Sequence, residues 1–259
     1  MNSNYEWNRL ESDYYHQLEY IVTWHYLNKY LPKTGKILDA GGGPGRYSLD
    51  LCRKGYDVTL LDISKENIIL AKQKFALESP DVHNKLTDAV QGDIRDMSRF
   101  ESHKFDATLC LGGPLSCIAD KQQRLQALSE IVRVTKKDGV IILGVMGYYA
   151  MLRTVMKQAS DQLLDEERIS LIQKGENIVR GERWHFFTVE RLIAEVESCG
   201  LKTIDIAGCE GLSSGLQEAT NALNDPIKRN AWEKIITQTS ADRAIAEISE
   251  HMIFIGEKQ

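Results

Sequence analysis

Residues 37–45 read Ile-Leu-Asp-Ala-Gly-Gly-Gly-Pro-Gly. A short apolar run leads to an acid at Asp39, and glycines follow at alternate positions, Gly41, Gly43 and Gly45. Glycines two residues apart let a strand turn sharply into a helix with bare backbone facing a ligand, on a path where a Cβ would clash. The stretch therefore predicts a strand, a ligand-binding turn and a helix, and the ligand that it favours is a nucleoside.

The spacing of the glycines separates the two classes of nucleoside cofactor that bind to such a turn. The dinucleotide fingerprint requires glycines at offsets of zero, two and five. Counted from Gly41, the third position is Arg46, and counted from Gly43 it is Ser48. A nicotinamide-dependent oxidoreductase is therefore an alternative that the missing third glycine opposes.

The pattern Asp-x-Gly-x-Gly-x-Gly that begins at Asp39 resembles the first motif of the class I S-adenosylmethionine-dependent methyltransferases. Residues 91–94, Gln-Gly-Asp-Ile, resemble the adenine-binding motif of this family, and residues 105–112 look like its fourth strand, whose end runs under the sulfonium. The resemblance implies a Rossmann-like fold and S-adenosylmethionine as the cofactor. It covers residues 30–145 well, and two later stretches, 186–206 and 251–258, moderately.

The resemblance also implies which residues contact each part of the cofactor. The acid at Asp62 ends the second expected strand, where a carboxylate can accept hydrogen bonds from both ribose hydroxyls. For the other positions the family pattern implies that Asp93 and Ile94 hold adenine, Ile63 packs beside it, Gly41, Gly43 and Gly45 line the methionine part, Asp39 steadies the turn and the amino acid part, and Leu111 lies below the sulfonium.

The apolar periodicity alternates between that of strands and that of helices. Strands are expected at residues 36–40, 57–62, 89–91, 105–111, 140–145, 202–206 and 252–255. Helices are expected at residues 46–53, 65–75, 121–134 and 189–199, the last three behind the caps Ser64, Asp120 and Thr188. The order predicts an α/β fold, a doubly wound, Rossmann-like three-layer sandwich whose seven-stranded, mostly parallel sheet carries helical insertions.

One methyltransferase-like domain is expected to span residues 1–259, with a cofactor-binding core at residues 30–146. Three segments exceed a minimal core: an N-terminal helical cap at residues 1–31 and probable helical insertions at residues 147–184 and 211–249. Connections that leave the carboxyl ends of strands can cover a ligand in an open α/β sheet. We therefore expect the cap and the first insertion to form walls over the substrate.

Composition narrows the range of partners. A net charge of −5 opposes a nucleic-acid surface, because phosphate neutralisation needs a basic face. No apolar run approaches about 18 residues and the N-terminus is polar, so neither a membrane span nor a signal peptide is expected. Five cysteines without a close pair suit a reducing, cytoplasmic compartment. No metal site is expected, because the six histidines lack zinc-like spacing.

The chain lacks two motifs that mark particular acceptors of the methyl group in this family. Residues 111–115 read Leu-Gly-Gly-Pro-Leu where family members that methylate nucleobase amines carry Asp/Asn-Pro-Pro-Tyr, and no Pro-Cys pair is present for base carbon methylation. A small-molecule acceptor is therefore predicted. The candidate proton acceptors are His185 and His16, and Tyr148 is a candidate for a hydroxyl that orients the acceptor. A non-catalytic nucleoside-binding or partner-binding protein with the same fold remains an alternative, and the oligomeric state is left open.

Overall fold

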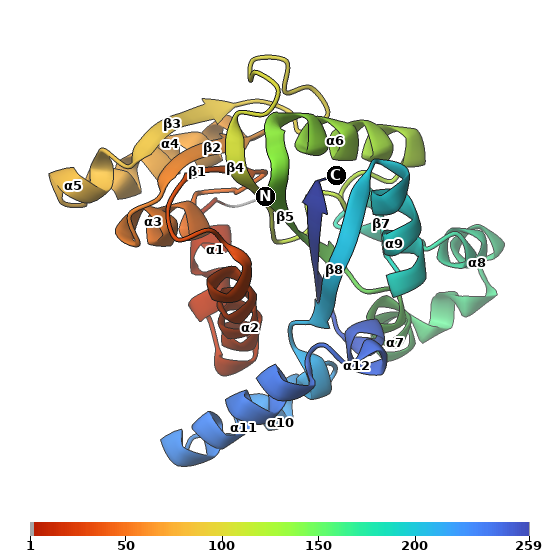
Figure 1. Ribbon diagram of the computed structural model, residues 1–259. Helices are drawn as coiled ribbons and strands as arrows, with labels where there is room; N and C mark the ends of the chain where they lie inside the picture. The colour runs from red at the N-terminus through yellow and green to blue at the C-terminus, as the bar shows by residue number, and fades with distance from the viewer. Residues whose placement is uncertain (1–2, 259) are drawn as a thin grey trace.

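Seven strands form one twisted sheet in the computed structural model, which describes residues 3–258 (Figure 1). The strand order is β3-β2-β1-β4-β5-β9-β8, and β9 runs antiparallel to both of its neighbours while the first five strands are parallel. The strands are β1 (Lys36–Ala40), β2 (Asp57–Asp62), β3 (Leu86–Gln91), β4 (Phe105–Cys110), β5 (Thr135–Met146), β8 (Leu201–Gly208) and β9 (His251–Lys258). The predicted seven-stranded, mostly parallel sheet is confirmed.

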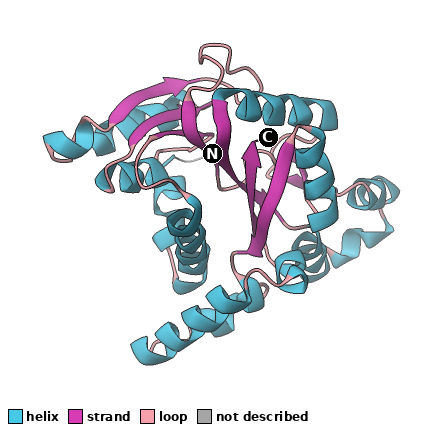
Figure 2. Cartoon of the chain, viewed as in Figure 1, coloured by secondary structure: helices cyan, strands magenta, loops and turns pink. Residues whose placement is uncertain are grey.

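Helices fill the connections between the strands (Figure 2). They are α1 (Ser3–Asn8), α2 (Tyr14–Tyr30), α3 (Arg46–Arg53), α4 (Lys65–Phe75), α5 (Pro80–His83), α6 (Lys121–Val134), α7 (Tyr148–Gln158), α8 (Glu166–Gln173), α9 (Val189–Ser198), α10 (Gln217–Asn221), α11 (Pro226–Thr239) and α12 (Arg243–Ile248), with 3-10 turns η1 (Arg9–Glu11), η2 (Ser160–Leu164) and η3 (Gly211–Ser213). The expected caps Ser64, Asp120 and Thr188 each accept a hydrogen bond from the third residue of their helix.

Two apolar clusters make the fold a three-layer sandwich. On one face of the sheet, Leu128 of α6 and Leu192 of α9 pack in the same cluster as the strand residue Leu38. On the other face, Val22 of α2 and Leu51 of α3 pack with the core of the same strands. Residues that alternate along each strand therefore point into opposite layers, as the pleat of a sheet requires.

The second insertion is helical, as predicted, and it supports α2. Both α10 and α11 contact α2. The Tyr14 hydroxyl donates to the backbone oxygen of Arg229 at 3.1 Å, and the side chain of Asn221 accepts from the backbone N–H of Tyr15 at 2.8 Å. In Figure 1 these helices lie beside the lower end of α2. The second insertion therefore holds in place the N-terminal helix that faces the sheet.

The first insertion is only partly helical, and the expectation for its last part was wrong. After α7 and α8 the chain forms a separate hairpin of β6 (Glu176–Val179) and β7 (Glu182–His185). The two loop residues, Arg180 and Gly181, have φ angles of 51° and 83°. Two successive residues at positive φ form the tight turn whose twist matches that of paired strands. The helical periodicity of the preceding residues led to a helical prediction for the whole segment, including this short hairpin.

Candidate active site

The glycine turn joins β1 to α3 at the carboxyl edge of the sheet. Gly41, Gly43 and Gly45 have φ angles of 75°, 57° and 83°, which residues with a Cβ rarely adopt. Gly42, which the sequence prediction did not single out, is also required, because a Cβ there would lie 2.4 Å from the carboxyl carbon of Asp39. A Cβ added at Gly43 would lie 3.9 Å from its nearest neighbouring atom, so the backbone of Gly43 faces open space.

Asp39 lies below the turn and is 1% exposed. One carboxylate oxygen accepts a hydrogen bond from the Ser48 hydroxyl at 2.6 Å, and the other has no partner among residues 3–258. Burial raises the pKa of Asp39 to about 6. A buried carboxylate oxygen without a partner is costly, so a donor from a bound ligand or a water fits this position.

Asp62 ends β2, as predicted, but most of its hydrogen-bonding capacity is already used. Its Oδ2 accepts from the backbone N–H of Gly43 at 2.8 Å, and its Oδ1 accepts from the backbone N–H of Ser64 at 2.9 Å and from the side chain of Asn67 at 3.0 Å. A carboxylate has about four acceptor positions. One position on Oδ2 is therefore left for a ligand, and the two free oxygens expected for the ribose hydroxyls are not both present.

The three predicted adenine contacts differ in their surroundings. Ile63 is 63% exposed beside the end of β2, and this exposed apolar side chain can cover a flat ring. Ile94 and Leu111 are buried in the core below the same edge. Asp93 is paired with Arg95, whose Nε lies 2.9 Å from both carboxylate oxygens, and hydrogen bonds from Arg95 lower the pKa of Asp93. An adenine amine would share Asp93 with this arginine.

The three predicted candidates for acid-base chemistry lie on three separate elements. His185 of β7 is 5% exposed, and burial, reinforced by nearby Arg124, lowers its pKa to about 3, so it is a weak proton acceptor. His16 of α2 is bound through Nδ1 to Asp13 at 2.7 Å. Tyr148 begins α7, where the Arg191 guanidinium lies 5.2 Å from its ring. Among residues 3–258, no hydrogen bond or ion pair joins any two of these candidates.

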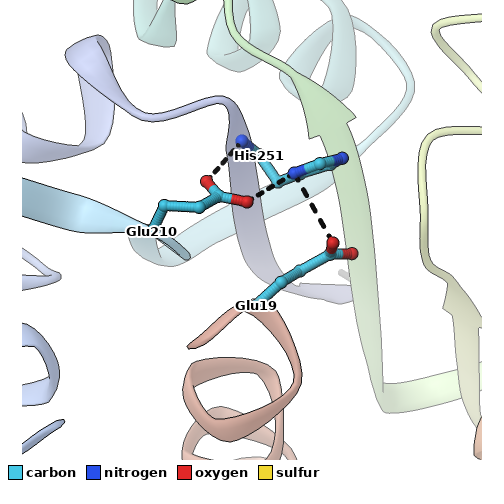
Figure 3. A group of neighbouring side chains, drawn as sticks. All are labelled: Glu19, Glu210 and His251. Atoms are coloured by element: carbon cyan, nitrogen blue, oxygen red, sulfur yellow. Dashed lines mark hydrogen bonds and ion pairs between the residues drawn. The ribbon is translucent and has the colours of Figure 1, made fainter. Parts of the chain in front are cut away.

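A buried charged cluster at the same edge of the sheet was not predicted. It consists of Glu19 from α2, Glu210 from the end of β8 and His251 from the start of β9, and it is shown in Figure 3. One oxygen of Glu210 accepts from the backbone N–H of His251 at 2.8 Å, and the other lies 2.5 Å from its ring Nδ1. Glu19 lies 3.6 Å from the same ring nitrogen and is held by two hydrogen bonds from Arg9.

The charges of the cluster are balanced in pairs. Burial alone would lower the pKa of His251, but Glu19 and Glu210 outweigh it and raise that pKa to about 9. Burial alone would raise the pKa of Glu19, but Arg9 and His251 outweigh it and lower that pKa to about 2. At neutral pH, Arg9 and His251 are therefore cations, each paired with a carboxylate.

These three residues are of the types that bind metals, and their ligand atoms all lie within 4.8 Å of one another. Sequence spacing did not reveal them because they come from distant parts of the chain. The antiparallel β9 brings His251 to the edge where β8 ends. Each oxygen of Glu19 already accepts a hydrogen bond from Arg9, and each oxygen of Glu210 is hydrogen-bonded to His251. We therefore interpret the cluster as an ion-pair network.

A small cavity of about 10 Å³, enough for one water molecule, lies against this cluster. It is lined by Glu19, Thr23, Tyr47, Leu111, Gly112, Gly144, Cys209, His251, Met252 and Ile253. Tyr47 follows Gly45 by two residues, and Leu111 belongs to the predicted cofactor set. The cavity therefore adjoins the glycine turn on one side and the charged cluster on the other.

Residues 37–139 match the family model described as a methyltransferase domain. A glycine/sarcosine N-methyltransferase from Aphanothece halophytica is 30% identical over 162 residues, which are 55% of this chain and 59% of that protein. A tRNA 5-carboxymethoxyuridine methyltransferase from Escherichia coli is 29% identical over 45% of each chain. A solved SAM-dependent methyltransferase from Methanosarcina mazei has a TM-score of 0.64 at 22% identity, covering 90% of this chain and 96% of its own.

Residues 37–139 of this chain therefore match a methyltransferase domain, and the fold is that of a solved SAM-dependent methyltransferase. The chain spans about half the length of these two relatives. The part of the chain that matches the family model contains the glycine turn, Asp62, Asp93 and Leu111, but it ends before Glu210 and His251. The predicted cofactor contacts therefore lie within the matched residues, whereas the charged cluster has to be interpreted from its own geometry.

Proposed function

We propose that this protein transfers a methyl group from S-adenosylmethionine to a small-molecule acceptor. The observation that supports the cofactor most strongly is the unpartnered oxygen of buried Asp39, a residue that lies against Gly42 next to the open backbone of Gly43. The free position on Asp62 and the exposed side chain of Ile63 extend this surface along the ends of β1 and β2. Carboxylates, bare backbone and an apolar side chain fit the amino acid, ribose and adenine parts of the cofactor.

The chain then has to position the acceptor. When bound, the cofactor supplies a methyl group that is already activated on a sulfonium. The protein must align the acceptor with that methyl group and exclude water.

Two observations favour a small acceptor. The net charge is −5, and a nucleic-acid surface is normally basic. One similar protein is named for glycine and sarcosine, although another is named for tRNA. We also place the protein in the cytoplasm, because all five cysteines are free. Among the described residues, no helix is both long and apolar enough to cross a membrane.

Calorimetric titration tests the cofactor directly. We expect S-adenosylmethionine and S-adenosylhomocysteine to bind with dissociation constants in the micromolar range, roughly −8 kcal/mol at 1 μM, and NAD not to bind. Tight binding of NAD without a response to either adenosyl ligand would overturn the proposal and favour an oxidoreductase.

A further inference from the structure

Helix α1 lies beside α3, the helix that follows the glycine turn (Figure 1). Trp7 of α1 is 9% exposed, and the centre of its ring lies 5.6 Å from the guanidinium of Arg46 and 4.7 Å from the ammonium of Lys74. Arg46 begins α3 directly after Gly45, and Lys74 belongs to α4. Cations are attracted to the face of an indole ring. Trp7 therefore anchors α1 on the side of the predicted cofactor contacts.

The 3-10 turn η1 continues the N-terminal segment toward the end of β4. A Cβ added at Gly112 would lie 3.8 Å from Nη2 of Arg9. Two hydrogen bonds to Glu19 of α2, at 2.5 and 2.9 Å, hold Arg9 in this position. Gly112 directly follows Leu111, the residue predicted to lie below the sulfonium. The N-terminal segment therefore lies against the backbone where methyl transfer is expected.

The turn of the β6-β7 hairpin reaches α1 from the other layer of the fold. The Arg180 guanidinium lies 5.6 Å from the centre of the Tyr5 ring on α1. Phe187, just after β7, packs in the apolar cluster of α6 and α9, whereas Trp7 packs in the cluster of α2 and α3. The backbone N–H of Phe187 also donates to the oxygen of Met146, the last residue of β5, at 2.8 Å. The contact between Arg180 and Tyr5 therefore joins the two outer layers across the carboxyl edge of the sheet.

Cys117, in the loop after β4, has both of these elements as neighbours. Burial raises the pKa of its thiol to about 12, and the negative charges of Glu182, Glu6 and Asp62 add to this effect. Glu182 begins β7, Glu6 belongs to α1, and Asp62 carries the predicted ribose contact at the end of β2. The hairpin and α1 thus approach each other beside the predicted cofactor site.

We propose that α1 and the turn of the β6-β7 hairpin form a gate over the cofactor and acceptor sites, closed by the contact between Tyr5 and Arg180. The proposal rests on the methyltransferase function, since a gate acts only on ligands that bind beneath it. Trp7 is buried, whereas Tyr5 is 47% exposed and Arg180 is exposed, and a cation–π contact between exposed side chains is weak. The gate therefore opens at this contact, and ligands exchange through it.

Cross-linking tests the gate in the full chain. Tyr5→Cys and Arg180→Cys are combined with Cys117→Ser and Cys199→Ser, because the remaining cysteines, Cys52, Cys110 and Cys209, are buried. A short bismaleimide bridges the two new cysteines, and the same protein treated with N-ethylmaleimide is the matched control. In stopped-flow fluorescence we expect the bridge to slow both binding and release of S-adenosylhomocysteine by about tenfold or more, with the dissociation constant within about threefold, because a gate alters access and not the bound contacts.

A single substitution gives a second readout. Arg180→Ala removes the contact and should raise both rates about two- to fivefold. Arg183→Ala removes another arginine of the same hairpin, which pairs with Glu176 at 3.7 Å, and should change neither rate. If S-adenosylhomocysteine does not bind to the wild-type protein, the proposed function itself fails. If it binds, but the two cysteines cannot be bridged or the bridged protein exchanges it at the rate of the control, the gate is wrong.

Discussion

At the scale of single residues, the site depends on buried carboxylates that each serve two purposes. Asp62 holds the backbone of Gly43 and the first turn of α4 while keeping one acceptor position toward the open side of the turn. Glu210 likewise fixes the backbone and the ring of His251. Such groups connect stability to ligand binding, because removing one both loosens the local backbone and removes a contact.

Substitution of Asp62 tests its ligand contact. We expect Asp62→Ala to weaken S-adenosylhomocysteine binding by about 1.5–3 kcal/mol, the usual size for hydrogen bonds to a charged group, which is about ten- to hundredfold in affinity. Asp88→Ala removes an exposed acid from the neighbouring strand β3 and should have no effect. Titration calorimetry measures both variants. Unchanged affinity in folded Asp62→Ala protein would place the ribose elsewhere.

The pKa of His251 predicts how stability depends on pH. A histidine pKa raised to about 9 in the folded protein means that its stabilisation is fully present below the unfolded pKa of 6.5 and is lost as the pH rises through 9. We expect the free energy of unfolding to fall by about 1–3 kcal/mol between pH 6.5 and pH 9.5. His251→Gln should flatten this part of the profile in urea unfolding, whereas His25→Gln should not. An equally steep decline in His251→Gln would assign the titration to another group.

At the scale of elements, the sequence predicted most of what lies between Lys36 and Met146. Strand and helix periodicity, helix caps and glycine spacing depend on residues that are close in the sequence. In this part of the chain the elements form where these local patterns predict them. Gly200, which follows α9, has a φ angle of 84°, the left-handed conformation in which glycine commonly ends a helix. The β6-β7 hairpin was missed because four-residue strands give too short a pattern to recognise. The charged cluster was missed because it forms only when the antiparallel β9 inserts between β5 and β8.

The first insertion remains a predicted wall of the acceptor site. Trp184 of β7 packs with α7 in a small apolar cluster outside the main core. We expect Trp184→Ala to leave S-adenosylhomocysteine affinity within about threefold, a change below ~0.7 kcal/mol, but to raise the Michaelis constant or lower turnover for the acceptor. Steady-state kinetics on the folded fraction measures this effect. Normal kinetics together with a lowered melting temperature would make the insertion purely structural.

At the scale of the whole molecule, two halves meet at the carboxyl edge of the sheet. The ends of β1, β2 and β4 carry the predicted cofactor contacts, and α2 with the ends of β8 and β9 carries the charged cluster and one wall of the cavity. Helices α10 and α11 support α2 from outside.

The most direct test of methyl transfer is to incubate the protein with isotopically labelled S-adenosylmethionine and fractionated cell metabolites, with an RNA fraction run in parallel. We predict that label appears in a small-molecule fraction, with one S-adenosylhomocysteine formed for each methyl group transferred, and that the RNA fraction stays unlabelled. Binding of the cofactor without any labelled product would favour a non-catalytic nucleoside-binding protein. Label found in RNA instead would contradict the small-molecule acceptor.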